Sequence, residues 1–451
     1  MTPLEYAGKR SVGHRVDTHV LIFFSTMSAI ILAIADYSYL TPFLITPVAL
    51  WLSRRHLSVF YVSPVWLVSC FLWVLGLLGW FTYPFLAGEG GGGIRVNLPP
   101  EIATKTVFLV GVSVAILSIT ASITASLGHP RHHVRGVLRI RASGQLRVAL
   151  AFMAVIPGFL SILDSGLGSL LFRTEYQGMD IGTLGVLTRQ LAIGSVAILG
   201  LLYPRSSHAF KIFIIVALSF YFFLFFGWGS RRIAMLPLLF VIGICIAGVP
   251  RNQALRWIAA GCTTSLLFLP IPLYLRNLGD HGIFPYWASL PRILENGPSW
   301  IETLNNIMVF FPITAATAYM TSPIPVEHFV IELNPLPGRM TNWYEISSTM
   351  GLNFSTPYSG IGELGNMGWA WVVVVWAVVG ILLAILDMAA HKALIDNRPV
   401  FAAAIIGLCV LFALTVTQYN FRNAQRDLVY AFVVAFFVYV LPLLGTNRIR
   451  R

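Results

Sequence analysis

The chain has 451 residues, of which 57% are hydrophobic and 11% are charged, and its formal net charge is +12. So few charged residues cannot cover a water-exposed surface of this size, which excludes an ordinary soluble enzyme. The basic residues stand in short clusters between apolar runs, for example at 9–15, 54–55 and 448–451, which is typical of the cytoplasmic side of a membrane protein rather than of nucleic-acid binding.

Twelve apolar runs predict an all-α, polytopic integral membrane protein with about twelve transmembrane helices. In chain order the runs are 20–35, 37–52, 60–83, 106–127, 148–163, 181–202, 212–226, 233–249, 257–274, 368–388, 400–416 and 428–444. When both ends are placed in the cytoplasm, most basic clusters fall on that side, so the positive-inside rule favours this orientation.

The only long connection between apolar runs covers 275–367, on the side opposite the termini. We therefore predict one polytopic membrane domain, 1–451, with one large periplasmic loop, 275–367, that contains short helices. Apolar residues recur at helical spacing over 300–311, which predicts a helix lying in the membrane interface.

Six arginines are predicted at the outer ends of helices or in the long loop. They are Arg231, Arg232, Arg276, Arg339, Arg422 and Arg426. A guanidinium group near a membrane is costly and normally has an anionic or buried partner, and its forked donors match phosphate oxygens. We interpret the six as ligands of a lipid diphosphate. The alternative is that they bind lipid headgroups or form ion pairs with nearby acids.

Carboxylates on the outward side provide candidates for a general base. Glu345 and Glu363, both in the long loop, are the leading choices, followed by Asp280 with His281, and then by His328. Each can equally be a solvated loop residue. The chain has no Asp-x-Asp motif, so we predict neither a metal nor another cofactor, and arginines would stabilise a departing diphosphate instead.

Several short motifs resemble the Wzy-type oligosaccharide repeat-unit polymerases of bacterial O-antigen and enterobacterial common antigen assembly. The motifs are Gly229-Ser230-Arg231, Leu275-Arg276 with Gly279, Pro337-Gly338-Arg339 followed by Trp343-Tyr344-Glu345, Gly360-Ile361-Gly362-Glu363-Leu364-Gly365-Asn366-Met367-Gly368, and Arg422 before the last apolar run.

This resemblance implies a metal-independent, GT-C-like glycosyltransferase of the bacterial inner membrane. Such an enzyme moves a growing glycan from undecaprenyl diphosphate onto an incoming undecaprenyl-diphosphate-linked repeat unit. The implied partners are these lipid-linked oligosaccharides, membrane lipids and a protein that regulates chain length. Arg231, Arg276, Arg339 and Arg422 match arginines of the family's pattern, whereas Arg232 and Arg426 are chosen from their positions alone. The general base does not carry over from the family.

Three other functions remain open at this point. An O-antigen ligase, which transfers glycan to a lipid A core, would use a loop histidine such as His281 or His328. A transporter of polysaccharide or lipid-linked oligosaccharide is disfavoured because the apolar runs contain almost no carboxylates, although Arg189 within the sixth run fits either class. A GT-C enzyme that uses polyprenyl monophosphate sugars is expected to have a long, acidic first outward loop, which this chain lacks.

Overall fold

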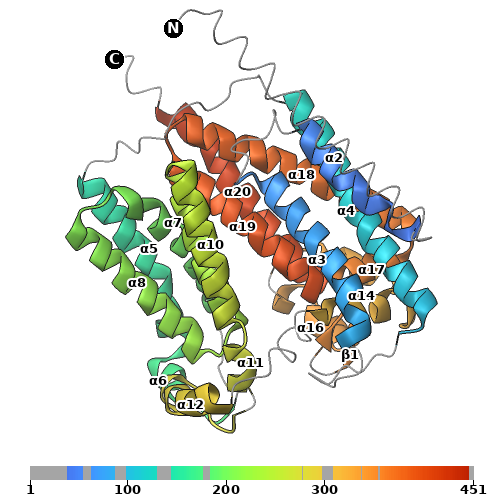
Figure 1. The fold of residues 1–451 in the computed structure, drawn as a ribbon, viewed down its shortest axis with the longest axis horizontal. Helices are drawn as coiled ribbons and strands as arrows, with labels where there is room; N and C mark the ends of the chain where they lie inside the picture. Colours follow the sequence, from blue (N-terminus) through green and yellow to red (C-terminus); the bar gives the residue numbers. More distant parts are fainter. Residues whose placement is uncertain are drawn as a thin grey trace, which may run out of the picture.

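The computed structural model describes residues 38–53, 62–86, 98–128, 144–175, 183–276, 278–296, 308–336, 338–353 and 356–445, and this part of the chain is mostly helical (Figure 1). Its α-helices are α2 (Pro42–Ser53), α3 (Pro64–Leu86), α4 (Pro100–Gly128), α5 (Gly144–Ser165), α6 (Leu167–Leu171), α7 (Thr183–Leu202), α8 (His208–Gly227), α9 (Leu236–Ile246), α10 (Arg251–Phe268), α11 (Ile271–Arg276), α12 (Ile283–Asn296), α14 (Phe310–Tyr319), α15 (Val326–Glu332), α16 (Trp343–Ser347), α17 (Gly360–Met367), α18 (Trp369–Ile395), α19 (Pro399–Gln418) and α20 (Phe421–Gly445). Short 3-10 helices occur at η1 (Ser38–Leu40), η2 (Tyr203–Arg205), η3 (Arg231–Met235) and η4 (Gly338–Met340), and β1 (Gly351–Asn353) pairs antiparallel with β2 (Thr356–Pro357).

Proline and serine set several helix starts. Helices α2, α3, α4 and α19 begin at a proline, whose missing N–H would have no partner in the first turn anyway. The Ser359 hydroxyl caps α17 by accepting from the Gly362 N–H at 2.9 Å. Helix α17 is separated from α18 by Gly368, whose φ of +103° is readily adopted only by glycine. The buried helix α17 and the long helix α18 therefore remain two elements.

Six of the described helices are long and apolar enough to cross a membrane. Their apolar parts are Pro64–Pro84, Pro100–Leu127, Arg147–Ser165, His208–Gly227, Trp369–Ile395 and Pro399–Gln418. Shorter apolar helices cover Pro42–Ser53, Leu191–Leu202 and Arg232–Ile246. The protein is accordingly an all-α, membrane-embedded protein, and six rather than twelve of its described helices meet the length and composition of a span.

Eleven of the predicted apolar runs coincide with helices of the structure, from α2 to α10 and from α18 to α20, and the first run, 20–35, lies outside the described residues. The shortfall in spans has a physical reason in some of these helices. Helix α9 has 11 residues and α2 has 12, and each is shorter than a bilayer's hydrocarbon core requires. A count of apolar runs treats such short helices as full spans.

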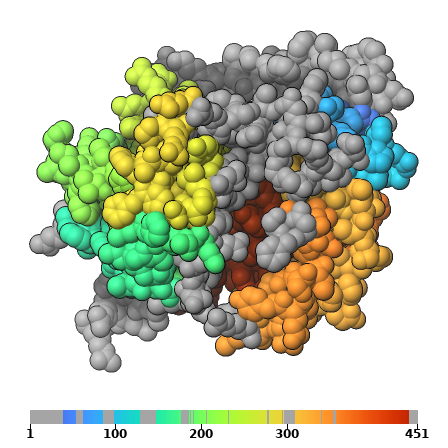
Figure 2. All heavy atoms as spheres, turned by 90° about the horizontal axis from the view of Figure 1, so that it is seen from below, coloured from blue at the N-terminus to red at the C-terminus, as the bar shows by residue number. Residues whose placement is uncertain are grey.

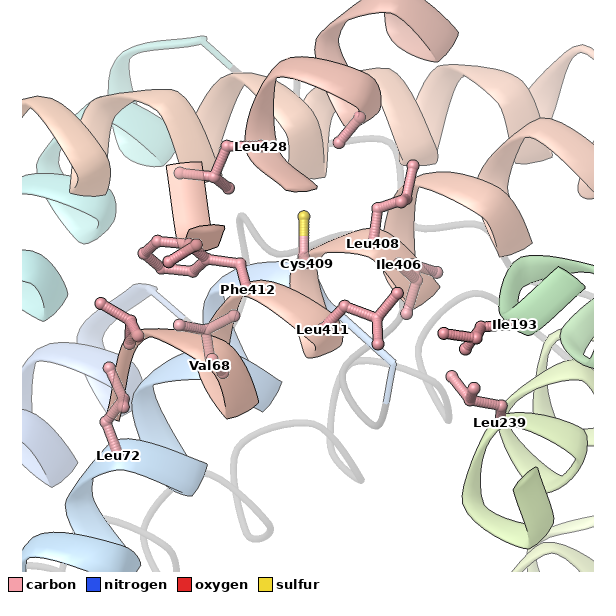
Figure 3. Packing of buried hydrophobic residues seen from close by; sticks show 14 of the residues in the cluster. Val68, Leu72, Ile193, Leu239, Ile406, Leu408, Cys409, Leu411, Phe412 and Leu428 are labelled. Atoms are coloured by element: carbon pink, nitrogen blue, oxygen red, sulfur yellow. The ribbon is translucent and has the colours of Figure 1, made fainter. Parts of the chain in front are cut away.

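Helix α19 joins two groups of helices. In Figure 1, α5, α7, α8 and α10 lie on one side, α2, α3 and α4 lie on the other, and α18 to α20 lie between them. Figure 3 shows how α19 contacts both groups: its side chains pack toward Val68 and Leu72 of α3 and toward Ile193 of α7 and Leu239 of α9. Because α20 follows α19 after a two-residue turn, the start of α20 lies at the junction of the two groups.

Much of the predicted loop 275–367 is integrated into the helical bundle. Helix α14 packs against α17 and α4, and Phe310 and Phe311 at its start are buried in the main core. The predicted interfacial helix over 300–311 is not seen in the part that is described, since Met308 and Phe311 are buried in protein, while 301–307 lies outside the described residues. Hydrophobic spacing alone could not distinguish a lipid-facing stripe from a core-facing one.

Helices α7 and α9 cross through a pair of glycines. A Cβ on Gly200 would clash with the carbonyl oxygen of Phe240, and a Cβ on Gly243 would clash with that of Ala197. Nothing lies within 4 Å of a Cβ built on Gly194 in the same α7 helix. The two backbones therefore approach each other more closely than any larger residue allows.

We expect Gly200→Ala to lower the thermal stability of the detergent-solubilised protein, with a cost of about 1–3 kcal/mol from overpacking. Gly194→Ala is the matched control in the same helix and should be neutral or stabilising by roughly 0.5–1 kcal/mol, because it only restricts the unfolded chain. The melting temperatures of both variants measure the difference, and equal temperatures would contradict the close crossing of α7 and α9.

Candidate functional site

Three predicted site residues, Glu363, Arg422 and Arg426, come together at the start of α20. Tyr419 and Asn420 form the turn that precedes this helix, and the Tyr419 carbonyl accepts from the Gly360 N–H at 2.9 Å. The Phe421 N–H donates to Oε2 of Glu363 at 2.8 Å, and the Asn423 N–H donates to Oδ1 of Asn420 at 3.2 Å. The Glu363 carboxyl thus satisfies one of the free N–H groups of the first turn, where the helix dipole also favours negative charge.

Arg422 is fully buried, and both of its Nη groups donate to protein acceptors, whereas its Nε has no hydrogen-bond partner. Nη1 donates to the Ile331 carbonyl at 2.6 Å, and Nη2 donates to the Leu336 carbonyl at 2.6 Å and to the Thr341 hydroxyl at 2.9 Å. Its guanidinium carbon lies 4.9 Å from the centre of the Trp343 ring, within range of a cation–π contact. Arg422 therefore fastens the segment between α15 and α16 to α20.

Two neighbours of Arg422 on the same face of α20 hold the same segment. Gln425 Nε2 donates to the Glu332 carbonyl at 3.1 Å, and Arg426 Nη2 donates to the Leu336 carbonyl at 3.1 Å. Residues three and four apart share one helix face, which explains why 422, 425 and 426 act together. We call this set of contacts the α20 clamp: the side chains of Arg422, Gln425 and Arg426 on the segment 331–343.

A pair of buried carboxyl groups lies behind the clamp. Glu332 and Glu363 are both completely buried, and Glu332 donates a hydrogen bond to Glu363 when it carries the proton. Apart from this contact, three carboxyl oxygens of the pair have no hydrogen-bond partner. They are both oxygens of Glu332 and Oε1 of Glu363. The two acids form a unit that shares a proton, because two adjacent ionised carboxylates in a dry site would be unfavourable.

Burial is the main cause that raises the pKa of both acids. The pKa of Glu363 rises to about 8, and the Phe421 N–H and the bond from Glu332 oppose the rise. The pKa of Glu332 rises well above its ordinary value because of burial and then because of the neighbouring Glu363, while the positive charge of Arg422 opposes it. At neutral pH the pair therefore retains a proton.

A second group of charges joins α20 to the other half of the bundle. Asp427 is buried, its Oδ2 accepts from the Thr415 hydroxyl at 3.1 Å, and its Oδ1 has no hydrogen-bond partner. The charges of Arg232 and Arg426 both act on this carboxylate. Arg232 lies in η3, where its N–H donates to the Ser230 hydroxyl at 3.3 Å. Two half-buried guanidinium groups, one from η3 and one from α20, therefore act electrostatically on one buried carboxylate.

Seen from the lower end of Figure 1, the protein has a hollow between its two halves (Figure 2). In this view red atoms of the C-terminal helices are visible between green and yellow atoms on one side and orange atoms of the segment that includes α16 and α17 on the other.

The other predicted site residues occupy separate elements. Arg231 is the first residue of η3, Arg276 the last residue of α11 and Arg339 the middle residue of η4. Glu345 lies on α16 and is exposed, two residues after the Trp343 that stacks on Arg422. The roles assigned to these residues from the sequence remain predictions.

The histidines of the predicted loop differ in their surroundings. His281 is buried, its Nδ1 lies 2.9 Å from the Tyr286 hydroxyl, and its backbone pairs with Arg173. Burial is the main cause that lowers the pKa of His281. His328 is half-buried on α15. Within the described residues, no group of three His, Cys, Asp or Glu side chains is placed to hold a metal ion.

Sequence reasoning missed Glu332 and Gln425. Glu332 ends α15 and lies three residues after Phe329, which is fully buried, so both share the inward face of this helix. A helix predicted over 326–332 would have revealed this pairing. No sequence signal could have revealed that Arg422 contacts carbonyl groups about 90 residues earlier in the chain, at Ile331 and Leu336.

Comparison with protein-family models, with curated proteins and with solved structures finds no match to this chain. The site is therefore interpreted from its own residues.

We predict that replacing Glu363 with Gln changes the pH dependence of stability. An acid whose pKa is raised on folding binds more protons in the folded state, so its contribution to the free energy of unfolding falls as pH rises from about 4.5 to about 8. Relative to wild type, Glu363→Gln should gain melting temperature across this interval, because the amide oxygen still accepts from Phe421. Glu345→Gln, at an exposed position, should follow the wild-type curve; a Glu363→Gln curve parallel to wild type would refute the buried proton.

Arg422→Ala should release the segment 331–343, since it removes three hydrogen bonds and the stacking on Trp343. A loss of about 3 kcal/mol or more of local stability is expected when buried acceptors lose a charged donor. Limited chymotrypsin digestion measures the release as faster cleavage after Trp343 and Tyr344. Arg292→Ala, which alters an exposed arginine of α12, is the control, and identical cleavage rates for both variants would contradict the clamp.

Proposed function

We propose that this protein is a polymerase that joins undecaprenyl-diphosphate-linked oligosaccharide repeat units into a surface polysaccharide such as O-antigen. The observation that supports it best is that two guanidinium groups, of Arg232 in η3 and of Arg426 in α20, both act electrostatically on the buried carboxylate of Asp427 in a membrane-embedded bundle. Guanidinium groups at such a depth suit the diphosphate of a membrane lipid, which bears several negative charges.

In this proposal the arginines of the site have two kinds of role. Arg422 is a positioning residue, because its Nη donors already bind carbonyl and hydroxyl oxygens of 331–341. Arg426 is only half-buried and makes one described hydrogen bond, through Nη2, so its other Nη donor remains for a phosphate oxygen. Arg232 approaches from the other half of the bundle. Arg231, Arg276 and Arg339 complete the diphosphate site if the family resemblance holds.

The reaction would be a transfer of a glycosyl group at the anomeric carbon. The bond from this carbon to the diphosphate oxygen breaks, and the leaving lipid diphosphate takes the electron pair and is stabilised by the arginines. A hydroxyl of the incoming repeat unit forms the new glycosidic bond, and a carboxylate accepts its proton. Glu345 is accessible for this task. Glu363 is completely buried beneath α20 and acts instead as a positioning residue that caps Phe421.

The proposal includes a location and partners. The protein would lie in the bacterial inner membrane with about twelve spans and a GT-C-like fold, with both termini in the cytoplasm and the α20 clamp at the periplasmic end. Lipid-linked oligosaccharides would be its substrates, and a chain-length regulator would be its protein partner. The burial of His281 against Tyr286 disfavours the ligase alternative that would use this histidine as the base.

An in vitro polymerisation assay tests this function. Purified protein is mixed with lipid-diphosphate-linked repeat units from its own host, and chain length is read on a gel. We expect a ladder from wild type and from Arg292→Ala, and a loss of at least about 100-fold in rate for Arg232→Ala combined with Arg426→Ala, as expected when charged contacts to a leaving group are removed.

Two further variants separate the roles of the acids. Glu345→Gln should abolish the ladder, because an amide cannot accept the proton, whereas Glu363→Gln should retain it, because the cap on Phe421 persists. No ladder from wild type, together with transfer to an added lipid A core, would replace the polymerase with a ligase. Inactivity in both assays would favour a transporter.

A further inference from the structure

Helix α15 has an unusual distribution of side chains. Its inward face buries Phe329 and the carboxyl of Glu332, while Val326, Val330 and the following Leu333 are exposed, Val330 by 58%, together with Glu327 in the first turn. A helix in contact with water would normally bury its apolar residues and expose its acid. The outward face of α15 therefore matches an apolar solvent better than water.

The inward face of α15 places this helix at the end of a membrane-crossing helix. The Phe329 ring lies 5.4 Å from the ring of Trp371 in the first turn of α18 and 5.6 Å from the ring of Phe421. Helix α18 also exposes an apolar face, which includes Trp369, Val374 and Val378. Tryptophan concentrates where membrane helices meet the headgroup region, so Trp369 and Trp371 mark the depth at which α15 lies.

Apolar exposure continues past α15 and ends beside two arginines. Leu336 is 50% exposed and Met340 is 72% exposed, and the carbonyl of Leu336 accepts from both Arg422 and Arg426. The surface thus combines an apolar face with one partly exposed guanidinium group, that of Arg426, since Arg422 is buried. Segments of this kind bind at the boundary between acyl chains and anionic headgroups.

We propose that the outward face of α15 and the turn after it, made of Val326, Val330, Leu333, Leu336 and Met340, lies in the bilayer among phospholipids. The acyl chains contact the five apolar side chains. This inference goes beyond the proposed function and does not rest on it, since it depends only on the membrane-crossing helices and on the surface of α15.

Site-specific photocrosslinking tests the proposal. Benzoylphenylalanine replaces Val330 in the full-length protein, which is reconstituted in vesicles of phosphatidylethanolamine and phosphatidylglycerol and illuminated, and lipid adducts are measured by mass spectrometry. The same residue at Val378 on the exposed face of α18 is the positive control. Benzoylphenylalanine in place of Glu101 is the negative control, because Glu101 is an exposed acid at the start of α4 that pairs with Lys105.

We expect phospholipid adducts at position 330 at a yield close to that at 378 and several-fold above that at 101. Adducts at 378 but not at 330 would overturn the proposal, and so would crosslinks from 330 to a protein instead of a lipid. If the Val330 variant fails to elute as a folded protein, the same substitution at Val326 takes its place with the same expected result. Polymerisation activity does not enter this readout, so failure of the proposed enzyme function leaves the result interpretable.

Discussion

The buried guanidinium group of Arg422 determines the arrangement of the outward segments. A cation without solvent exposure must find acceptors, and it finds them in the carbonyls of Ile331 and Leu336 and in the hydroxyl of Thr341. These contacts fix 331–343 against α20, with the proton-sharing pair of Glu332 and Glu363 behind it. Removing Arg422 would leave the carbonyl oxygens of Ile331 and Leu336 without their charged donor.

The bundle places this unit where two groups of helices meet. Because α19 packs against both α3 and α7, the turn after it carries the start of α20 to the junction, where the charge of Arg232 in η3 acts on Asp427. Charged residues at a membrane protein's internal junction are costly unless they serve a ligand or an ordered contact. The described contacts use Arg422 for order and leave donors of Arg426 for a ligand, which is the division of roles that the proposed polymerase requires.

The sequence predicted the helices well and the site only in part. Apolar runs located α3, α4, α18 and α19, because a helix in lipid needs a continuous apolar surface. The same reasoning treated 275–367 as a loop, because α14 and α17 are too short for a span and because glycines such as Gly362 suggest a turn. In the structure Gly362 lies in a helix instead, and it is small because a larger side chain would clash with Thr317. Glu363 was singled out as a base from its glycine-rich surroundings. Its burial and its bond to Phe421 depend on contacts far apart in the chain, and no local pattern encodes them.

The central claim is that the arginines flanking Asp427 bind a lipid diphosphate, and direct binding tests it without requiring catalysis. Native mass spectrometry can measure the retention of polyprenyl diphosphate by the detergent-released protein. We predict retention by wild type and by Arg292→Ala, and its loss from the double variant Arg232→Ala, Arg426→Ala, with each protein measured well below its own melting temperature. Equal retention by all three folded proteins would contradict the account.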